Sequence, residues 1–364
     1  MKRLISIIFV SCAVVMSLMF MGCKRNSYTI KANTPNATEG EYYYLHDAIT
    51  GECLDSMAVA DNKVVFKGKA DSVRIVALLN MNQAPVVLFL EPGTIVVDLD
   101  SGQVSGTKLN EDYNKFITNP DLMRMTEQCE ALRNNVDLTD DEAIQMEFVE
   151  QYDILKDSLQ AKINEECMKV YNNHKKDLLG AYILTIASQS MEFEEFDEIM
   201  SDADPVISGF QPLAEIYTAW KGTEATQPGH KFVDIEGMDY GTKQNTSLSK
   251  MIGGKTAVVD FWASWCRPCR EEIESNLIGI YNDYKDKGVT VIGIDVHDKP
   301  EDHAKAMAEL GIPYPQLIDV DGNGAAIYGV MSIPQIILID KDGNIVKRNL
   351  RGEEIRKALD ELLK

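Results

Sequence analysis

The spacing of hydrophobic positions changes twice along the chain and divides it into three regions. Residues 27–104 hold short apolar runs separated by turn-forming residues, a pattern typical of strands. Residues 110–221 repeat apolar positions every three or four residues, which predicts helices with one buried face. From Phe232 onward, apolar runs of strand length alternate with helical stretches. The pattern therefore predicts a small β-sandwich-like domain, a helical middle region and a C-terminal α/β domain.

Local signals within the first two regions predict particular elements. The sequence of residues 41–45 predicts a strand. The turn at Asp61-Asn62 predicts a hairpin between residues 57–59 and 64–66. Residues 139–142 spell Thr-Asp-Asp-Glu, a capping box at the start of a long helix. The apolar stripe of that helix is expected to pack within the chain. We therefore expect an antiparallel sandwich followed by packed helices.

The last region has a boundary and a regular order of elements. Residues 223–229 are small, polar and contain Pro and Gly, so we place a domain boundary there. The dipeptide Asp342-Gly343 is a strong hairpin signal near the end of the chain. The expected domains are residues 27–106, 110–222 and 227–364. In the last domain we expect strands at residues 256–263, 289–296, 336–339 and 345–348, and helices at residues 268–287, 300–310 and 352–364.

The composition excludes one class of partner. The chain has 364 residues and a formal net charge of -21. A nucleic-acid backbone requires Lys and Arg, so nucleic acid is not an expected partner. The same charge disfavours docking on anionic lipid headgroups by charge alone.

The first residues form a targeting segment rather than part of the fold. Lys2 and Arg3 precede an apolar run over residues 4–21, and Gly22-Cys23 closes the segment. This pattern predicts a lipoprotein signal over residues 1–22, with lipid attached to Cys23, although Phe20 stands where such signals more often carry Leu. An uncleaved anchor helix and an ordinary secretion signal are the alternatives. Each of these exports the chain, and we favour the periplasmic side of the cell envelope.

Three cysteines have no assigned chemistry. Cys53, Cys129 and Cys167 remain once the signal, the lipid site and one closely spaced pair are set aside. Cys129 and Cys167 each lie in a helical apolar stripe, so we expect both to be core residues. A disulfide between these two remains an alternative that the sequence does not decide.

The candidate chemistry lies in residues 258–269, VVDFWASWCRPC. An apolar run predicts a buried strand, and Cys266 and Cys269 then stand one helical turn apart, within bonding reach. A helix that begins here offers free N–H groups and a positive dipole end to Cys266, and both favour a thiolate. This arrangement predicts thiol–disulfide exchange, with Cys266 as the nucleophile and Cys269 as the second thiol.

Residues 260–269 resemble the thioredoxin active site, and the flanking sequence resembles the TlpA/ResA-type branch of membrane-tethered thiol–disulfide oxidoreductases. The resemblance covers residues 227–364. Upstream, the chain is similar to Bacteroidetes-type lipoproteins with a β-rich domain ahead of a thioredoxin-like one. The resemblance implies a thioredoxin fold, no cofactor, and protein thiols or disulfides as substrates. It also implies a thiol-transferring membrane protein as the source of electrons.

The same resemblance gives roles to residues outside the cysteine pair. Asp260 matches the buried acid of thioredoxins, which makes it the candidate base for Cys269. Ile333-Pro334 resembles the cis-proline loop that faces the active site, where the backbone would pair with an extended substrate. Thioredoxins usually carry a Pro five residues after the second cysteine. Glu274 stands there instead, so we expect a straighter helix or one bent for another reason.

The residues around the pair are expected to contact substrate. Trp265 and Trp262 are predicted to line the site, with Trp265 the more exposed and Trp262 in the core. Arg267 brings positive charge close to Cys266, and Pro268 suits the first turn of a helix. Glu271, Glu272 and Glu274 are expected to make the rim acidic.

Three other hypotheses about function compete with that of an oxidoreductase. A zinc site on the two cysteines would need two more ligands, and His297 and His303 lie far along the chain, so no metal is expected. A thiol-dependent peroxidase would carry Thr and Pro where Ala263 and Val259 stand. A non-catalytic envelope binding module, with an incidental cysteine pair, is the third alternative.

Overall fold

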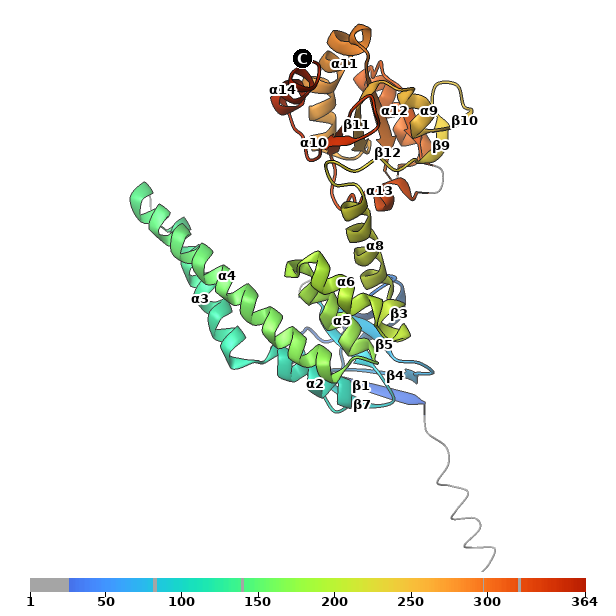
Figure 1. Cartoon of the computed structure of the whole chain (residues 1–364). Helices are drawn as coiled ribbons and strands as arrows, with labels where there is room; N and C mark the ends of the chain where they lie inside the picture. The colour runs from blue at the N-terminus through green and yellow to red at the C-terminus, as the bar shows by residue number, and fades with distance from the viewer. Residues whose placement is uncertain (1–25, 81–83, 139–140, 297, 320–321) are drawn as a thin grey trace, which may run out of the picture. The chain divides into compact units, whose positions relative to one another are not determined.

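The computed structural model describes residues 26–80, 84–138, 141–296, 298–319 and 322–364 (Figure 1). One compact unit ends at Leu213, and a second begins at Ala214. The expected signal over residues 1–22 and the expected lipid site, Cys23, lie outside the described residues. Among the helices of the described ranges, none is both long enough and apolar enough to cross a bilayer.

Two β-sheets with alternating burial open the N-terminal unit. One sheet has the order β4-β1-β7-β8, formed by β4 (Lys63–Lys69), β1 (Ser27–Asn33), β7 (Gly93–Asp98) and β8 (Gln103–Ser105). The other has the order β3-β2-β5-β6, formed by β3 (Cys53–Ala58), β2 (Tyr42–Asp47), β5 (Arg74–Leu79) and β6 (Val86–Leu90). In β1, Tyr28, Ile30 and Ala32 are buried while their neighbours are not, as expected for a strand with one covered face. The β-rich region is confirmed, but β1 and β7 pair in parallel, so the arrangement is not purely antiparallel.

The predicted hairpin at Asp61-Asn62 is wrong in its pairing. Both residues have positive φ, 52° and 57°, and Ala60 and Lys63 form an isolated bridge around them. The turn is therefore present. Beyond it, however, β3 pairs with β2 and β4 pairs with β1, so the chain passes from one sheet to the other. Alternating hydrophobicity identified the strands but carried no information about their partners.

Helices make up the rest of this unit: α2 (Lys108–Ile117), α3 (Pro120–Asp137), α4 (Glu142–Asn173), α5 (Leu178–Ala187), α6 (Phe193–Ser201) and α7 (Pro205–Ser208). α8 (Gln211–Ala225) follows across the boundary at Leu213. Figure 1 shows α3 and α4 side by side as a two-helix arm. Asp141 caps α4 by accepting hydrogen bonds from the N–H groups of Ala143 and Ile144, whereas the expected cap, Thr139, lies outside the described residues.

The apolar stripe of α4 is buried less than the sequence predicted. Ile144, its first member, is exposed. The members that follow are only half-buried: Phe148, Tyr152, Leu155, Leu159 and Ile163. Burial becomes complete only toward the other end, at Cys167. Cys129 and Cys167 are both buried free thiols, which confirms their assignment to the core and excludes the alternative disulfide; Cys53 is free and exposed.

The C-terminal unit is a mixed sheet covered on both faces, in the order β10-β9-β13-β12-β11-β14-β15 (Figure 1). Its strands are β9 (Glu236–Asp239), β10 (Asn245–Ser247), β11 (Thr256–Trp262), β12 (Val289–Asp295), β13 (Gln316–Ile318), β14 (Gln335–Ile339) and β15 (Ile345–Lys347). Its helices are α9 (Leu248–Ile252), α10 (Arg267–Glu272), α11 (Ile278–Tyr284), α12 (Pro300–Leu310), α13 (Gly324–Ile327) and α14 (Glu353–Leu362). Parallel pairing of β11 with β12, followed by the antiparallel hairpin β14–β15, confirms the expected topology.

The central strand β11 separates two hydrophobic cores. Every residue of β11 is buried, which explains why its sequence is an uninterrupted apolar run rather than an alternating one. Val258 and Trp262 belong to the core beneath α10, α11, α12 and α14, whereas Val259 and Phe261 belong to the core beneath α9 and α13. Alternation along β11 therefore fixes which face of the sheet each side chain meets.

The helix after the cysteine pair is interrupted without a proline. A π-helical turn over Ile273–Leu277 joins α10 to α11, and it contains Glu274, the position where thioredoxins usually have Pro. The turn is a feature that can bend a helix in the absence of Pro, as the second of the two expectations requires. Single π turns of this kind are common at functional sites.

Candidate redox active site

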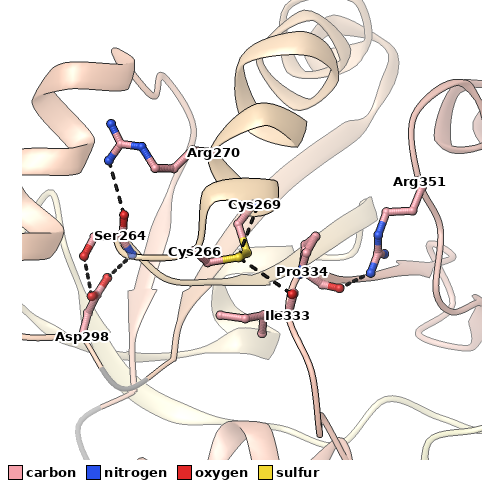
Figure 2. The surroundings of a disulfide bond; sticks show 8 residues. All are labelled: Ser264, Cys266, Cys269, Arg270, Asp298, Ile333, Pro334 and Arg351. Carbon is pink, nitrogen blue, oxygen red and sulfur yellow. Dashed lines mark hydrogen bonds between the residues drawn. A yellow bond between two sulfur atoms is a disulfide. The ribbon is translucent and has the colours of Figure 1, made fainter. Parts of the chain in front are cut away.

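The two cysteines lie where strand β11 turns into helix α10. Cys266 and Cys269 form a disulfide with an S–S distance of 2.01 Å and Cα atoms 5.3 Å apart (Figure 2). Cys266 is 5% exposed and Cys269 is fully buried. Cys266 is thus the sulfur that an incoming disulfide can reach, in the order that the sequence predicted.

Cys266 occupies the N-cap position of α10. Its Sγ atom accepts a hydrogen bond from the backbone N–H of Cys269 at 3.2 Å. Pro268 lies in the first turn, where backbone N–H groups have no partner within the helix, so its lack of an N–H costs no hydrogen bond. An N–H donor and the positive end of the helix both stabilise negative charge on Cys266, so the local structure favours its thiolate over its thiol.

A second loop meets the disulfide from the opposite side. The peptide bond between Ile333 and Pro334 is cis, as the resemblance implied. The carbonyl oxygen of Ile333 lies 3.8 Å from Cys266 Sγ, and the Arg351 guanidinium donates a hydrogen bond to the carbonyl oxygen of Pro334 (Figure 2). The loop therefore presents backbone groups directly beside the accessible sulfur.

Asp260 lies on the face of β11 that carries the redox core. It stands two residues from both Val258 and Trp262 along the strand, so it shares the face of these residues, which pack in the same core as Cys269. Asp260 is buried, and neither of its carboxylate oxygens has a hydrogen-bond partner among the described residues. A buried carboxyl without a partner is costly to ionise.

The surroundings of Asp260 shift its pKa strongly. Burial and, to a smaller extent, the negative charge of Glu272 raise the pKa of Asp260 to about 8, while the positive charge of Arg351 acts in the opposite direction. An unperturbed thiol has a pKa of about 8.5. Because the pKa of Asp260 lies far above that of an ordinary carboxyl, this group is a stronger base than an exposed aspartate.

Glu272 was expected on an acidic rim, and the structure corrects this. It is half-buried and accepts a hydrogen bond from the backbone N–H of Gly352 at 2.9 Å. Its charge acts on Asp260. Glu272 stands three residues after Cys269, and helical spacing could have indicated that it projects from the same side of the helix.

The turn before Cys266 is held in place by Asp298, a residue that no sequence motif marks. Ser264 donates hydrogen bonds to Asp298 from both its backbone N–H and its hydroxyl, each at 2.6 Å (Figure 2). Arg270 donates to the carbonyl oxygen of Ser264 at 3.4 Å. Asp298 is 34 residues from Ser264 along the chain, and no local pattern connects them.

The remaining predicted side chains divide into core and surface. Trp262 is buried and donates from Nε1 to Gln316 Oε1 at 2.9 Å, whereas Trp265 is 65% exposed. Both placements agree with the sequence. Arg267 is exposed and pairs with Glu271 at 2.8 Å. Its charge is therefore shared with a carboxylate and screened by solvent, and it adds little to the stability of a Cys266 thiolate.

Comparison with known proteins identifies two matching families along the chain. Residues 228–348 match the AhpC/TSA family, and residues 28–113 match a domain of unknown function, DUF4369.

Individual relatives carry related names. Thiol-disulfide oxidoreductase ResA of Bacillus thuringiensis is 32% identical over 143 residues, which cover 39% of this chain and 76% of that protein. Thiol:disulfide interchange protein HelX of Rhodobacter capsulatus is 38% identical over 114 residues, covering 30% of this chain and 62% of HelX. The crystal structure of the thioredoxin domain of a thiol-disulfide oxidoreductase from Bacteroides vulgatus is 30% identical, with a TM-score of 0.36, and covers 38% of this chain and 99% of that one. The chain thus belongs to the ResA-type thiol–disulfide oxidoreductases and carries an AhpC/TSA thioredoxin-like domain.

Proposed function

We propose that the chain reduces protein disulfides in the cell envelope through the dithiol of Cys266 and Cys269, with residues 227–364 as the catalytic domain. The observation that carries this proposal is the position of Cys266 Sγ. It accepts the N–H of Cys269 at 3.2 Å and lies 3.8 Å from the carbonyl oxygen of Ile333. One sulfur is thereby activated by a helix end and placed beside a backbone edge that can hold a substrate.

The reaction begins with the reduced pair. The Cys266 thiolate attacks one sulfur of the substrate disulfide, a mixed disulfide forms, and the other substrate sulfur leaves as a thiolate. Asp260 takes the proton of Cys269, whose thiolate attacks Cys266 Sγ. The second substrate sulfur leaves and takes up a proton. The substrate has gained two electrons, and Cys266 and Cys269 are left as the disulfide seen in the structure.

Exposed apolar side chains on both sides of the disulfide form the proposed substrate surface. Trp265 projects into solvent from the turn before Cys266, and Met331 is exposed in the loop that leads to Ile333 and Pro334. An extended substrate segment would pair with the backbone around Ile333 and rest against these side chains. Arg267 and Pro268 complete the rim at the start of α10.

The location and the electron donor belong to the same proposal. An apolar N-terminal segment that ends in Gly22-Cys23 supports export and a lipid anchor on Cys23. An anchored reductase in an oxidising compartment needs a supply of electrons. A thiol-transferring membrane protein is the proposed donor.

Disulfide reduction by purified protein tests this function. Residues 24–364 and dithiothreitol should reduce the disulfides of insulin faster than dithiothreitol alone, and Cys266→Ser should remove the acceleration. Cys53→Ser is the matched control, because Cys53 is the exposed free cysteine of the described ranges. If Cys266→Ser keeps the wild-type rate, or if Cys53→Ser loses it, the proposed function is wrong.

A further inference from the structure

A histidine and two aspartates converge behind the turn that precedes Cys266. Asp295 ends strand β12, Asp298 follows in the next loop, and His303 lies on helix α12. Each residue offers one ligand atom, and these atoms lie within 4.8 Å of one another. Nδ1 of His303 is 3.7 Å from an oxygen of Asp295 and 3.8 Å from an oxygen of Asp298. These distances are too long for hydrogen bonds.

His303 is the unusual member of this group. It is 1% exposed, and neither ring nitrogen has a hydrogen-bond partner among the described residues. The rings of Trp262 and Tyr240 pack against it, each with a centroid distance of 5.2 Å. A buried polar group without a partner costs free energy, so such groups in folded proteins are normally satisfied by protein, water or an ion.

We propose that Asp295, Asp298 and His303 bind a first-row divalent cation, with Zn²⁺ as the best match to the donors. Zn²⁺ takes His nitrogen and carboxylate oxygen at about 2.0–2.2 Å, which places tetrahedral ligand atoms roughly 3.4 Å apart. The two separations from Nδ1, 3.7 and 3.8 Å, require shifts of a few tenths of an ångström, and the two carboxylates, whose ligand atoms lie within 4.8 Å of each other, would also close in. A water molecule would supply a fourth ligand.

The donor set argues against other ions and against the redox thiols. Ca²⁺ and Mg²⁺ prefer shells made of oxygen ligands, whereas an imidazole favours transition metals. None of the three residues is a cysteine, so this site differs from a zinc site on Cys266 and Cys269, for which the chain lacks further ligands at suitable spacing. It also goes beyond the proposed disulfide reduction, because binding requires no change in the state of Cys266.

The position of the site links it to the turn that carries the nucleophile. Asp298 accepts both hydrogen bonds from Ser264, which stands two residues before Cys266. A cation on Asp298 would share the oxygens that hold this turn. We therefore expect cation binding to change the rate at which Cys266 attacks a disulfide, and this effect should require Asp298.

Cobalt titration of the disulfide form tests the site. Co²⁺ serves as a spectroscopic probe for Zn²⁺, and the protein is residues 24–364 with Cys53→Ser, treated with a chelator and kept oxidised so that the redox thiols cannot bind. We expect one equivalent of Co²⁺ to give visible ligand-field bands without a thiolate charge-transfer band. Zn²⁺ should displace it, and a paramagnetically shifted imidazole resonance should appear in the NMR spectrum.

Three variants decide the outcome. His303→Gln and Asp295→Asn should each weaken Zn²⁺ binding by at least about tenfold, since each removes a direct ligand. Asp302→Asn, an exposed acid next to His303, should leave binding unchanged. Circular dichroism verifies folding of each variant. If His303→Gln does not fold, the proposal is tested by Zn²⁺ binding to Asp295→Asn and by the shifted imidazole resonance of the parent protein. Absence of ligand-field bands in the parent protein, or bands unchanged in a folded Asp295→Asn, would overturn the proposal. Disulfide reduction can survive either result.

Discussion

The backbone N–H of Cys269 donates a hydrogen bond to Cys266 Sγ across one helical turn, at 3.2 Å. The same turn makes Cys266 the N-cap of α10 and buries Cys269. One local geometry therefore separates the roles of two chemically identical side chains. The helix end stabilises negative charge on the outer sulfur, and in the proposed reaction the inner one gives its proton to Asp260.

The raised pKa of Asp260 should make the stability of the fold depend on pH in a defined direction. Its pKa is about 8 in the folded protein and about 3.9 in an unfolded chain. Because the folded-state pKa is the higher one, the unfolded state releases the proton first, and the free energy of unfolding falls as pH rises from about 4 to about 8.

Asp260→Asn removes this dependence. The stability of the variant relative to wild type should increase by on the order of 4 kcal/mol between pH 5 and pH 8, and then level off. Urea unfolding of the oxidised protein, followed by tryptophan fluorescence, measures this, because Trp220, Trp262 and Trp265 all lie in the C-terminal unit. A difference that is the same at every pH would show that Asp260 ionises normally.

Two charges around Asp260 should move the pH profile of the reaction in opposite directions. Glu272 raises the pKa of Asp260 and Arg351 lowers it. Glu272→Gln should therefore shift the midpoint of the second exchange step to lower pH, and Arg351→Gln should shift it to higher pH. An aromatic disulfide separates the steps, because one coloured thiol leaves when Cys266 attacks and the other leaves when Cys269 attacks.

The matched control for this pair is Glu271→Gln, which removes a carboxylate of the same helix that pairs with Arg267 at the surface. The midpoint should not move in this variant. Shifts of the same sign in Glu272→Gln and Arg351→Gln would mean that neither acts through the charge of Asp260.

Trp265 should contribute to recognition of protein substrates and little to the chemistry. It is 65% exposed beside Cys266, so Trp265→Ala removes contact area without opening the core. We expect KM for a protein disulfide to rise by about tenfold, as for a lost contact worth 1–2 kcal/mol. The rate with a small aromatic disulfide should stay unchanged. Leu363→Ala, at another exposed apolar residue, should alter neither value.

Local sequence was sufficient for elements whose signals are local. The uninterrupted apolar run of β11, the Pro at the start of α12 and the Asp342-Gly343 turn were each located correctly, because strand burial, helix capping and turn geometry depend on nearby residues. The order of exposure of Cys266 and Cys269 followed for the same reason.

Relationships across long separations were not accessible in this way. Strand β4 pairs with β1 rather than β3, and Asp298 accepts a hydrogen bond from the Ser264 hydroxyl. Both contacts depend on which segments lie close together in the folded chain. Glu272 was assigned to the surface because an acidic residue is usually solvated, but the approach of Gly352 gives it a partner inside the fold.

The assignment of Cys266 as the nucleophile is tested most directly by trapping the mixed disulfide and locating it on the chain. In Cys269→Ser the second thiol is absent, while the backbone N–H that activates Cys266 remains. Reaction with a disulfide-bonded peptide should therefore stop at a mixed disulfide, and mass spectrometry should locate the peptide on Cys266. A peptide found on Cys53, or no mixed disulfide at all, would contradict the assignment of Cys266 as the nucleophile.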